Sequence, residues 1–199
     1  MMEVKILLIT IAYLLGSFSS AIVVCRLMGL ADPRTQGSGN PGATNVLRHG
    51  SKKAAVITLL LDVFKGIVAV LLARLLTTDE ITLAAVTLAV FLGHLYPIFF
   101  HFKGGKGVAT AFGALTALFW QVGLTALIIW LAMAFIFRYS SLSALTAALI
   151  TPIAMFWFSQ GILAYTLVSI LIASFLLWRH RSNIRNLLNG KEDKIGATP

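Results

Sequence analysis

The chain has 199 residues, of which 58% are hydrophobic and 12% are charged, and its formal net charge is +9. A soluble domain of this length could not bury so much apolar surface, so the composition indicates an integral membrane protein. The basic residues lie between apolar runs and near the carboxyl-terminal end, which favours topology signals and anionic ligands over nucleic acid. The single cysteine, Cys25, excludes an intramolecular disulfide.

Apolar runs along the chain predict membrane-spanning helices. A span needs about 20 residues, so the fourth of the six runs is too long for one helix. We expect it to break near residues 120–123 into two short helices, which gives seven transmembrane helices in one all-α membrane domain of residues 1–199. The first run is expected to be a retained helix and not a cleaved signal peptide. The runs cover roughly 6–24, 54–76, 81–100, 108–137, 142–158 and 162–178.

The basic residues also predict the orientation of the helices. Lysine and arginine gather in the connections after the first and third runs and in the carboxyl-terminal tail. Such residues mark the cytoplasmic side of a membrane. Breaking the fourth run places Arg138 and the tail on that side as well. We therefore expect an outer amino terminus, a cytoplasmic carboxyl terminus, and every polar glycine-rich segment at the cytoplasmic face.

The first polar segment is a glycine-rich loop that follows the first apolar run. Its glycines allow a ligand to approach the backbone, its hydroxyl and amide groups form hydrogen bonds, and its arginine suits phosphate. The spacing also matches a dinucleotide fingerprint, but a membrane helix and not a strand precedes it, which excludes that site. An anion site or a flexible interfacial turn remain as alternatives. The segment reads Gly37-Ser38-Gly39-Asn40-Pro41-Gly42-Ala43-Thr44-Asn45 and continues to Arg48.

The second polar segment, Lys103-Gly104-Gly105-Lys106-Gly107, follows the third run. It resembles part of a P-loop but lacks the earlier glycine and the hydroxyl residue after the lysine, so ATP hydrolysis is not indicated. Glycine N–H groups that open a helix beside a lysine can still bind an anion. Alternatively, the lysines only mark the inner side. His94, just upstream, is expected to be a hydrogen-bonded structural histidine more readily than a catalytic one.

The third polar segment, Arg179-His180-Arg181-Ser182-Asn183-Ile184-Arg185, follows the last run. In a helix, His180 and Asn183 would lie on one face at i and i+3. An imidazole has an unperturbed pKa of about 6.5, so His180 is the best single candidate for proton transfer. The alternative is that the basic residues only set topology and bind anionic lipid.

Two charged residues inside the second run, Asp62 and Lys65, are also spaced at i and i+3. Charges in a membrane segment are costly, so we expect them either to pair with each other or to face a polar cavity. The histidines are scattered and the acidic residues do not cluster, so no set of metal ligands is predicted.

Together the three polar segments closely resemble the signatures of the PlsY family of bacterial integral-membrane acyl-phosphate:glycerol-3-phosphate acyltransferases. The resemblance covers the whole chain. It implies transfer of a fatty acyl group from acyl phosphate to the sn-1 hydroxyl of glycerol 3-phosphate, which gives lysophosphatidic acid and phosphate. It further implies a multi-pass protein of the bacterial cytoplasmic (inner) membrane that needs no cofactor, metal, nucleic acid or obligate protein partner. The motifs are Gly37–Asn45, Gly93-His94-x-x-Pro97 with Phe102–Thr110, and Arg179-His180-Arg181-x-Asn183.

On the basis of this resemblance, we form a hypothesis about the mechanism and about the roles of individual residues. We expect direct attack without an acyl-enzyme, with either His180 or the phosphate of the substrate as the base; an acylated Ser38 is the alternative mechanism. The expected catalytic residues are His180, Asn183 and Ser38. The acyl phosphate is expected to bind Gly37, Ser38, Gly39, Asn40, Gly42, Thr44, Asn45 and Arg48. Glycerol 3-phosphate is expected to bind Lys103, Gly104, Gly105, Lys106, Gly107, His180, Asn183 and Arg185.

Two other classes of protein compete with this enzyme. One is a transporter or binding protein for an anionic lipid or a phosphorylated solute, and the other is a regulatory membrane subunit whose basic loops bind anionic lipid. A transporter should place polar groups along a route across the bilayer, whereas these segments gather on one predicted side. The acyl chain length and the oligomeric state are not determined by the sequence.

Overall fold

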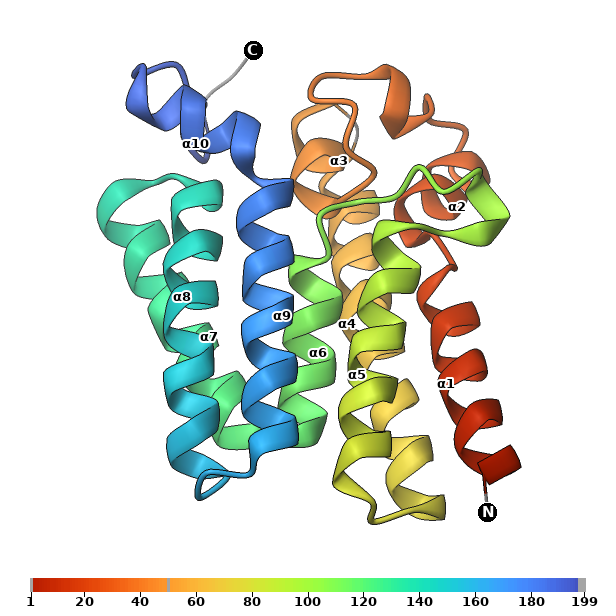
Figure 1. Ribbon diagram of the computed structural model, residues 1–199. Helices are drawn as coiled ribbons and strands as arrows, with labels where there is room; N and C mark the ends of the chain where they lie inside the picture. Colours follow the sequence, from red (N-terminus) through yellow and green to blue (C-terminus); the bar gives the residue numbers. More distant parts are fainter. Residues whose placement is uncertain (1, 50, 197–199) are drawn as a thin grey trace. The chain divides into compact units, whose positions relative to one another are not determined.

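The computed structural model describes residues 2–49 and 51–196, and all regular elements in these ranges are helices (Figure 1). Met1, Gly50 and residues 197–199 lie outside the described residues. The chain separates into two compact units, Met1–Leu118 and Phe119–Pro199, and each is described by itself. The single domain over residues 1–199 stays a prediction.

The described part of the first unit, residues 2–49 and 51–118, contains six α-helices and two short 3-10 helices. Serine and aspartate begin two of the long helices: Ser51 accepts a hydrogen bond from the Ala54 N–H at 3.4 Å, and Asp79 accepts one from the Thr82 N–H at 2.9 Å. The elements are α1 (Met2–Gly16), α2 (Ser20–Leu27), η1 (Pro33–Thr35), α3 (Ala43–His49), α4 (Lys52–Leu76), α5 (Glu80–Leu95), η2 (Ile98–Phe100) and α6 (Val108–Leu118).

Glycines bring two helix pairs of this unit into close contact. A Cβ added at Gly16 or Gly93, where α1 and α5 meet, would lie 2.1 or 2.3 Å from a carbonyl oxygen of the facing helix. The same holds for α4 and α6, where a Cβ at Gly66 or Gly113 would lie 2.4 or 2.1 Å from such an oxygen. In a membrane, helices associate mainly by close packing, so these glycines set the helix spacing that positions the loops above.

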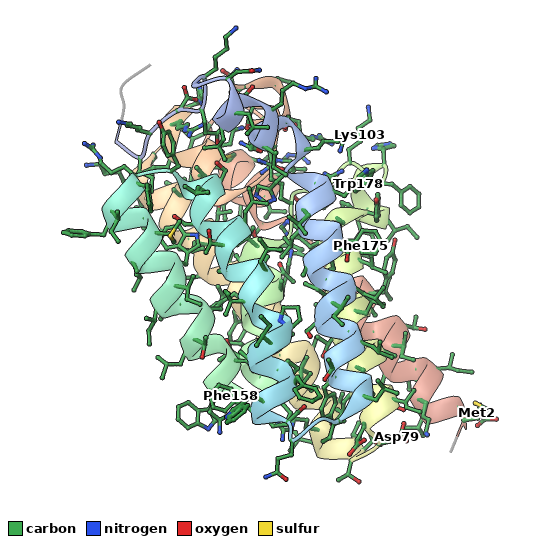
Figure 2. All side chains as sticks on the ribbon, turned by 60° about the vertical axis from the view of Figure 1, so that its left-hand side comes forward. Met2, Asp79, Lys103, Phe158, Phe175 and Trp178 are labelled. Atoms are coloured by element: carbon green, nitrogen blue, oxygen red, sulfur yellow. The ribbon has the colours of Figure 1, made fainter. Side chains whose placement is uncertain are left out.

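The second unit consists of α7 (Trp120–Phe137), α8 (Ser140–Phe158), α9 (Leu163–Arg179) and the short α10 (Arg181–Leu188). Helix α8 contacts both α7 and α9. In Figure 2, Phe158 and Trp178 mark opposite ends of this unit, with Phe175 one turn before Trp178 on α9. The helices carry many exposed large hydrophobic side chains, as helices facing lipid do.

Within the described residues, four helical segments are long and apolar enough to cross a membrane, and the number rises to six if each of two bent pairs is one span. The predicted division of the fourth run is confirmed, since α6 ends at Leu118 and α7 begins at Trp120. The break falls one residue before the predicted window. The count of seven spans and the orientation of the termini stay predictions.

The first apolar run is not one straight helix, contrary to expectation. It bends by 43° between α1 and α2. The two helices are separated by residues 17–19, where the Phe18 carbonyl accepts a hydrogen bond from the Lys65 ammonium at 2.8 Å. A carbonyl that bonds a side chain of another helix is released from the α-helical pattern, which explains why the helix stops there.

In each unit, the connections that carry basic residues lie at one end. In the first unit, Lys5 and Asp79 pair at 3.1 Å where α1 begins, and Figure 2 shows Lys103 at the opposite end from Met2 and Asp79. In the second unit, the turn between α7 and α8 meets the chain after α9, because the Ile195 N–H donates to the Arg138 carbonyl at 2.6 Å.

Candidate active site

The first glycine-rich loop begins with a local ion pair. Asp32 precedes η1 and accepts a hydrogen bond from the Arg34 N–H at 2.9 Å, while the Arg34 guanidinium contacts its carboxylate at 2.6 Å. These contacts, the side-chain hydrogen bond above all, lower the pKa of the Asp32 carboxyl. The Asp32–Arg34 pair is part-buried, so it fixes the backbone conformation of the residues that lead into the loop.

The predicted acyl-phosphate residues lie in this loop and on α3. Gly37, Ser38, Gly39, Asn40 and Gly42 lie between η1 and α3, and Thr44, Asn45 and Arg48 lie on α3. Gly37 and Gly39 have φ values of 51° and 66°, which favour glycine. A Cβ at Gly37 would lie 2.2 Å from the imidazole of His49. The loop therefore requires glycine for its own fold.

The side chain of Asn45 stabilises this loop through hydrogen bonds to its backbone. Its side chain is 3% exposed. Its amide donates to the carbonyls of Pro33 at 2.8 Å and Gln36 at 3.0 Å, and its oxygen accepts from the Ser38 N–H at 3.2 Å. Both amide hydrogens are thus used within the loop, and we infer that Asn45 positions Ser38. Its predicted contact with substrate stays a prediction.

The second glycine-rich loop lies on the last turn of α5. The Gly105 N–H donates to the His94 carbonyl at 3.2 Å, and a Cβ at Gly104 would lie 2.1 Å from the same oxygen. Gly107 has a φ of 87°, and a Cβ there would meet the ring of Phe91 at 2.5 Å. Close packing therefore requires these glycines, and Lys103 and Lys106 are carried on a loop of defined shape.

The two loops of the first unit meet at one point. A Cβ built on Gly105 would lie 3.1 Å from the Pro41 carbonyl oxygen. The segments predicted to bind the two substrate phosphates therefore adjoin, although about sixty positions separate them in the sequence. Both Ser38 and Lys103 are exposed at this end.

A buried ion network lies on the helices that carry these loops. Asp62 and Lys65 on α4 pair at 2.9 Å, with side chains only 3% and 7% exposed, which confirms the predicted pairing. Ser20 on α2 donates to the Asp62 carboxylate at 2.8 Å, and the Lys65 Nζ lies 3.0 Å from the His94 Nδ1 on α5. The sequence indicated the pair, but not that Ser20 and His94 join it from other helices.

In the second unit, His180 occupies the 58° bend between α9 and α10 and is 3% exposed. Its Nδ1 lies 2.8 Å from the Leu176 carbonyl oxygen. A carbonyl oxygen only accepts hydrogen bonds, so Nδ1 carries a hydrogen, and in the neutral ring the lone pair is then on Nε2. A proton transferred to a neutral His180 would therefore go to Nε2.

Asn183 on α10 is held by a residue that was not predicted as part of the site. Its amide donates to the Glu192 carboxylate at 2.7 Å, and the same carboxylate oxygen accepts a hydrogen bond from the Ser141 hydroxyl at 2.6 Å. Arg185 lies exposed on the same helix. The acidic pair Glu192-Asp193 in a mainly basic tail was the sequence signal that could have indicated this contact.

Comparison with known proteins identifies the family. The family model described as glycerol-3-phosphate acyltransferase matches residues 6–190. The chain is 58% identical over 185 residues to a glycerol-3-phosphate acyltransferase of Thioalkalivibrio sulfidiphilus, covering 93% of this chain and 91% of the relative. It is 50% identical over 196 residues to the protein of that name from Methylococcus capsulatus, covering 98% of each.

Solved structures agree with the family match. The crystal structure of PlsY (YgiH), an integral membrane glycerol 3-phosphate acyltransferase, in its glycerol 3-phosphate form has a TM-score of 0.91 at 39% identity and covers 96% of each chain. A lysophosphatidic acid form of PlsY has a TM-score of 0.89 at 38% identity and covers 96% of this chain and 95% of that chain. The chain is therefore a multi-pass membrane protein that belongs to the glycerol-3-phosphate acyltransferase (PlsY) family.

Proposed function

We propose that the protein transfers a fatty acyl group from acyl phosphate to the sn-1 hydroxyl of glycerol 3-phosphate, at the cytoplasmic face of the bacterial inner membrane. The observation that carries this proposal is the contact between the two glycine-rich loops at Pro41 and Gly105. Each substrate of this reaction has one phosphate, so the site must hold two anions side by side. Two adjoining loops with backbone N–H groups and cationic side chains meet that requirement.

The solved relatives support the acceptor and the product. One is described in a glycerol 3-phosphate form and the other in a lysophosphatidic acid form. We assign the loop around Ser38, with Arg48, to the acyl phosphate, and the loop of Lys103–Gly107 to glycerol 3-phosphate. We also assign His180, Asn183 and Arg185 to glycerol 3-phosphate binding.

The donor in this proposal is already activated, because an acyl phosphate is a mixed anhydride. The glycerol oxygen forms the new bond to the acyl carbon, the bond from that carbon to the phosphate oxygen breaks, and phosphate leaves. The protein has to orient the hydroxyl, stabilise the oxyanion and provide a place for the hydroxyl proton. None of these tasks requires coenzyme A, ATP or a metal ion.

The proton passes either to the Nε2 of His180 or to the phosphate of the substrate. The hydrogen bond from the His180 Nδ1 to the Leu176 carbonyl makes Nε2 the nitrogen through which a neutral ring would take it. Profiles of rate against pH for His180→Ala and His180→Asn distinguish the two bases. If kcat stays near normal and only KM rises, the phosphate of the substrate is the base. Loss of one limb of the profile with a fall in kcat assigns the proton to His180.

The alternative mechanism, in which Ser38 is acylated, predicts different kinetics and a covalent adduct. It predicts ping-pong kinetics and an acyl adduct on Ser38 that mass spectrometry detects after quenching without acceptor. Direct attack predicts a ternary complex and no adduct. A Ser38→Ala variant with measurable kcat excludes the covalent route.

The proposed function is tested by incubating the purified protein with acyl phosphates of several chain lengths and labelled glycerol 3-phosphate. We expect labelled lysophosphatidic acid with acyl phosphate and none with acyl-coenzyme A. Product from acyl-coenzyme A alone would contradict the proposed donor. No product with any donor would favour the transporter or binding protein.

The proposed orientation has a separate test. Cysteines introduced at exposed Lys191 and Glu80, in a Cys25→Ser background, report the two sides of the membrane. We expect a membrane-impermeant thiol reagent to label position 80 from outside intact spheroplasts and position 191 only in inverted vesicles. The reverse pattern would contradict a cytoplasmic carboxyl terminus.

A further inference from the structure

The buried ammonium of Lys65 has three hydrogen-bond acceptors and three hydrogens to give them. The acceptors are the Phe18 carbonyl at 2.8 Å, the Asp62 Oδ1 at 2.9 Å and the His94 Nδ1 at 3.0 Å. They come from the break between α1 and α2, from α4 itself and from the end of α5. The hydrogen bonds of the Lys65 ammonium therefore join α4 to the end of α5 and to the break between α1 and α2.

This arrangement determines the tautomer of His94. An ammonium group only donates, so Nδ1 of the imidazole must accept and the ring hydrogen must be on Nε2. The hydroxyl of Thr110, 3.2 Å from the same Nδ1, can also donate to it. A hydrogen on Nδ1 directed at Asp62, which is 3.5 Å away, would oppose the donor of Lys65.

The charges of Asp62 and Lys65 also indicate that the His94 imidazole is neutral. One carboxylate and one ammonium cancel, and Ser20 adds a neutral hydrogen bond to Asp62 at 2.8 Å. A protonated imidazole would add a second positive charge among side chains that are nearly all enclosed, and an unbalanced buried charge is strongly unfavourable. The imidazole of His94 is therefore neutral in this structure.

The other edge of the imidazole lies beneath the contact between the two loops. A Cβ built on Gly105 would be 2.3 Å from the His94 Nε2 and 3.1 Å from the Pro41 carbonyl oxygen. The backbone of the same histidine accepts the Gly105 N–H at 3.2 Å. His94 thus touches Gly105 with both its ring and its carbonyl, at the point where the loops meet.

We propose that His94 is a positioning residue, held by Lys65 as the neutral Nε2–H tautomer, whose ring sets the place of Gly105 and so the spacing of the two phosphate-binding loops. This inference rests on the proposed function of those loops. His94 acts through Gly105 and does not touch the reacting atoms. The ion pair in the membrane helices, 3% and 7% exposed, thereby gains a role in the site above it.

The tautomer is tested independently of activity. In protein labelled with ¹⁵N-histidine, long-range ¹H–¹⁵N correlation spectra distinguish the two neutral tautomers and the charged ring, and His94→Asn identifies the resonances of His94. We expect a neutral ring with its hydrogen on Nε2, and loss of this state in Lys65→Met. A hydrogen on Nδ1, or a doubly protonated ring, would overturn the proposal even if the protein were inactive as an acyltransferase.

The positioning role is tested by kinetics and stability together. His94→Asn leaves an amide oxygen near the former Nδ1, so Lys65 keeps an acceptor, but it removes the ring beneath Gly105. We expect a melting temperature close to that of the wild type and a fall of about 100-fold in kcat/KM, as for a displacement of about 1 Å at a reacting pair. The fall should appear in kcat, because the reacting groups are misaligned, and also in a higher KM for both substrates. A fall in kcat with both KM values unchanged would overturn the proposal.

A second variant approaches the same contact from the loop. Gly105→Ala places a methyl group against the intact ring and should give the same kinetic change. Because asparagine is smaller than histidine, the double variant Gly105→Ala/His94→Asn should lose no more than either single variant. Additive losses would show that the two positions act separately and would overturn the proposal. His101→Asn is the matched control: His101 is exposed, and asparagine accepts its φ of 57°, so unchanged kinetics are expected.

Discussion

The two compact units hold the polar groups of the candidate site in different ways. In the first, glycine backbone forms two loops, and a buried ion network on the helices below supports them. In the second, the polar groups are side chains of α10 and of the bend before it, held by hydrogen bonds to a carbonyl and to a carboxylate at the end of the unit.

This difference indicates how each unit responds to substitution. An ion pair inside a membrane unit has no water to replace a lost partner, so breaking it is costly. The hydrogen bond between Asn183 and Glu192 is only part-buried, so water can replace it and its loss affects orientation more than stability. We therefore expect substitutions of the buried ion pair to change folding, and substitutions of the hydrogen bonds of α10 to change catalysis.

The largest effect is expected when one member of the buried pair is removed. Asp62→Asn or Lys65→Met leaves an uncompensated buried charge and should lower the free energy of unfolding by about 3–5 kcal/mol. The double variant removes both charges and should recover most of that loss. Unfolding of the purified protein in mixed micelles measures all three. Single variants within 1 kcal/mol of the wild type would show that the pair is not energetically coupled.

Enlarging the glycine contacts between helices should have the next largest effect. Gly113→Ala places a Cβ 2.1 Å from the Val63 carbonyl oxygen and should destabilise the first unit by about 2–3 kcal/mol through overpacking. The control is Gly29→Asn, since no atom lies within 4 Å of the added Cβ and asparagine tolerates the φ of 66°. Equal melting temperatures for the two variants would contradict close packing as the cause.

In the second unit we expect a smaller change in stability but a clear change in activity. Glu192→Ala removes the acceptor of the Asn183 amide and the Ser141 hydroxyl. The expected fall in kcat/KM is about tenfold, equivalent to about 1.4 kcal/mol, as for a hydrogen bond to a charged group. Glu192→Gln keeps an acceptor oxygen and should lose less, and Lys191→Ala should be neutral. If Glu192→Ala unfolds the protein, Glu192 stabilises the unit and does not merely orient Asn183.

The smallest effect concerns the end of the first unit away from the loops. The hydrogen bond from Thr82, with help from Lys5, lowers the pKa of Asp79 to about 2. Since the folded pKa lies below the ordinary value of 3.8, this group stabilises the fold above about pH 4 and loses that contribution as the pH falls toward 2. The melting temperature of Asp79→Asn should therefore approach that of the wild type over this window. A constant difference between the two would contradict the linkage.

Much of the helical organisation could be predicted from the sequence. Apolar runs end where charged or glycine-rich segments begin, and this local pattern located the long helices and the division near residue 120. The bend after Gly16 could not be predicted, because its cause is a hydrogen bond from Lys65, 47 positions away from Phe18. The motif residues were also recognisable, but Glu192 was not, since its role depends on Asn183 and Ser141 being brought to it.

By itself, the sequence determined that this is a membrane protein, which segments are helical, which loops carry anion-binding groups, and which family the motifs resemble. These properties depend on composition and on short-range spacing. Only the tertiary structure decided that Pro41 meets Gly105, that Asn45 is used within its own loop, and that Lys65 orients His94. The physical reason is that each of these contacts joins different helices or loops, and their spacing depends on how closely the glycines allow the helices to pack.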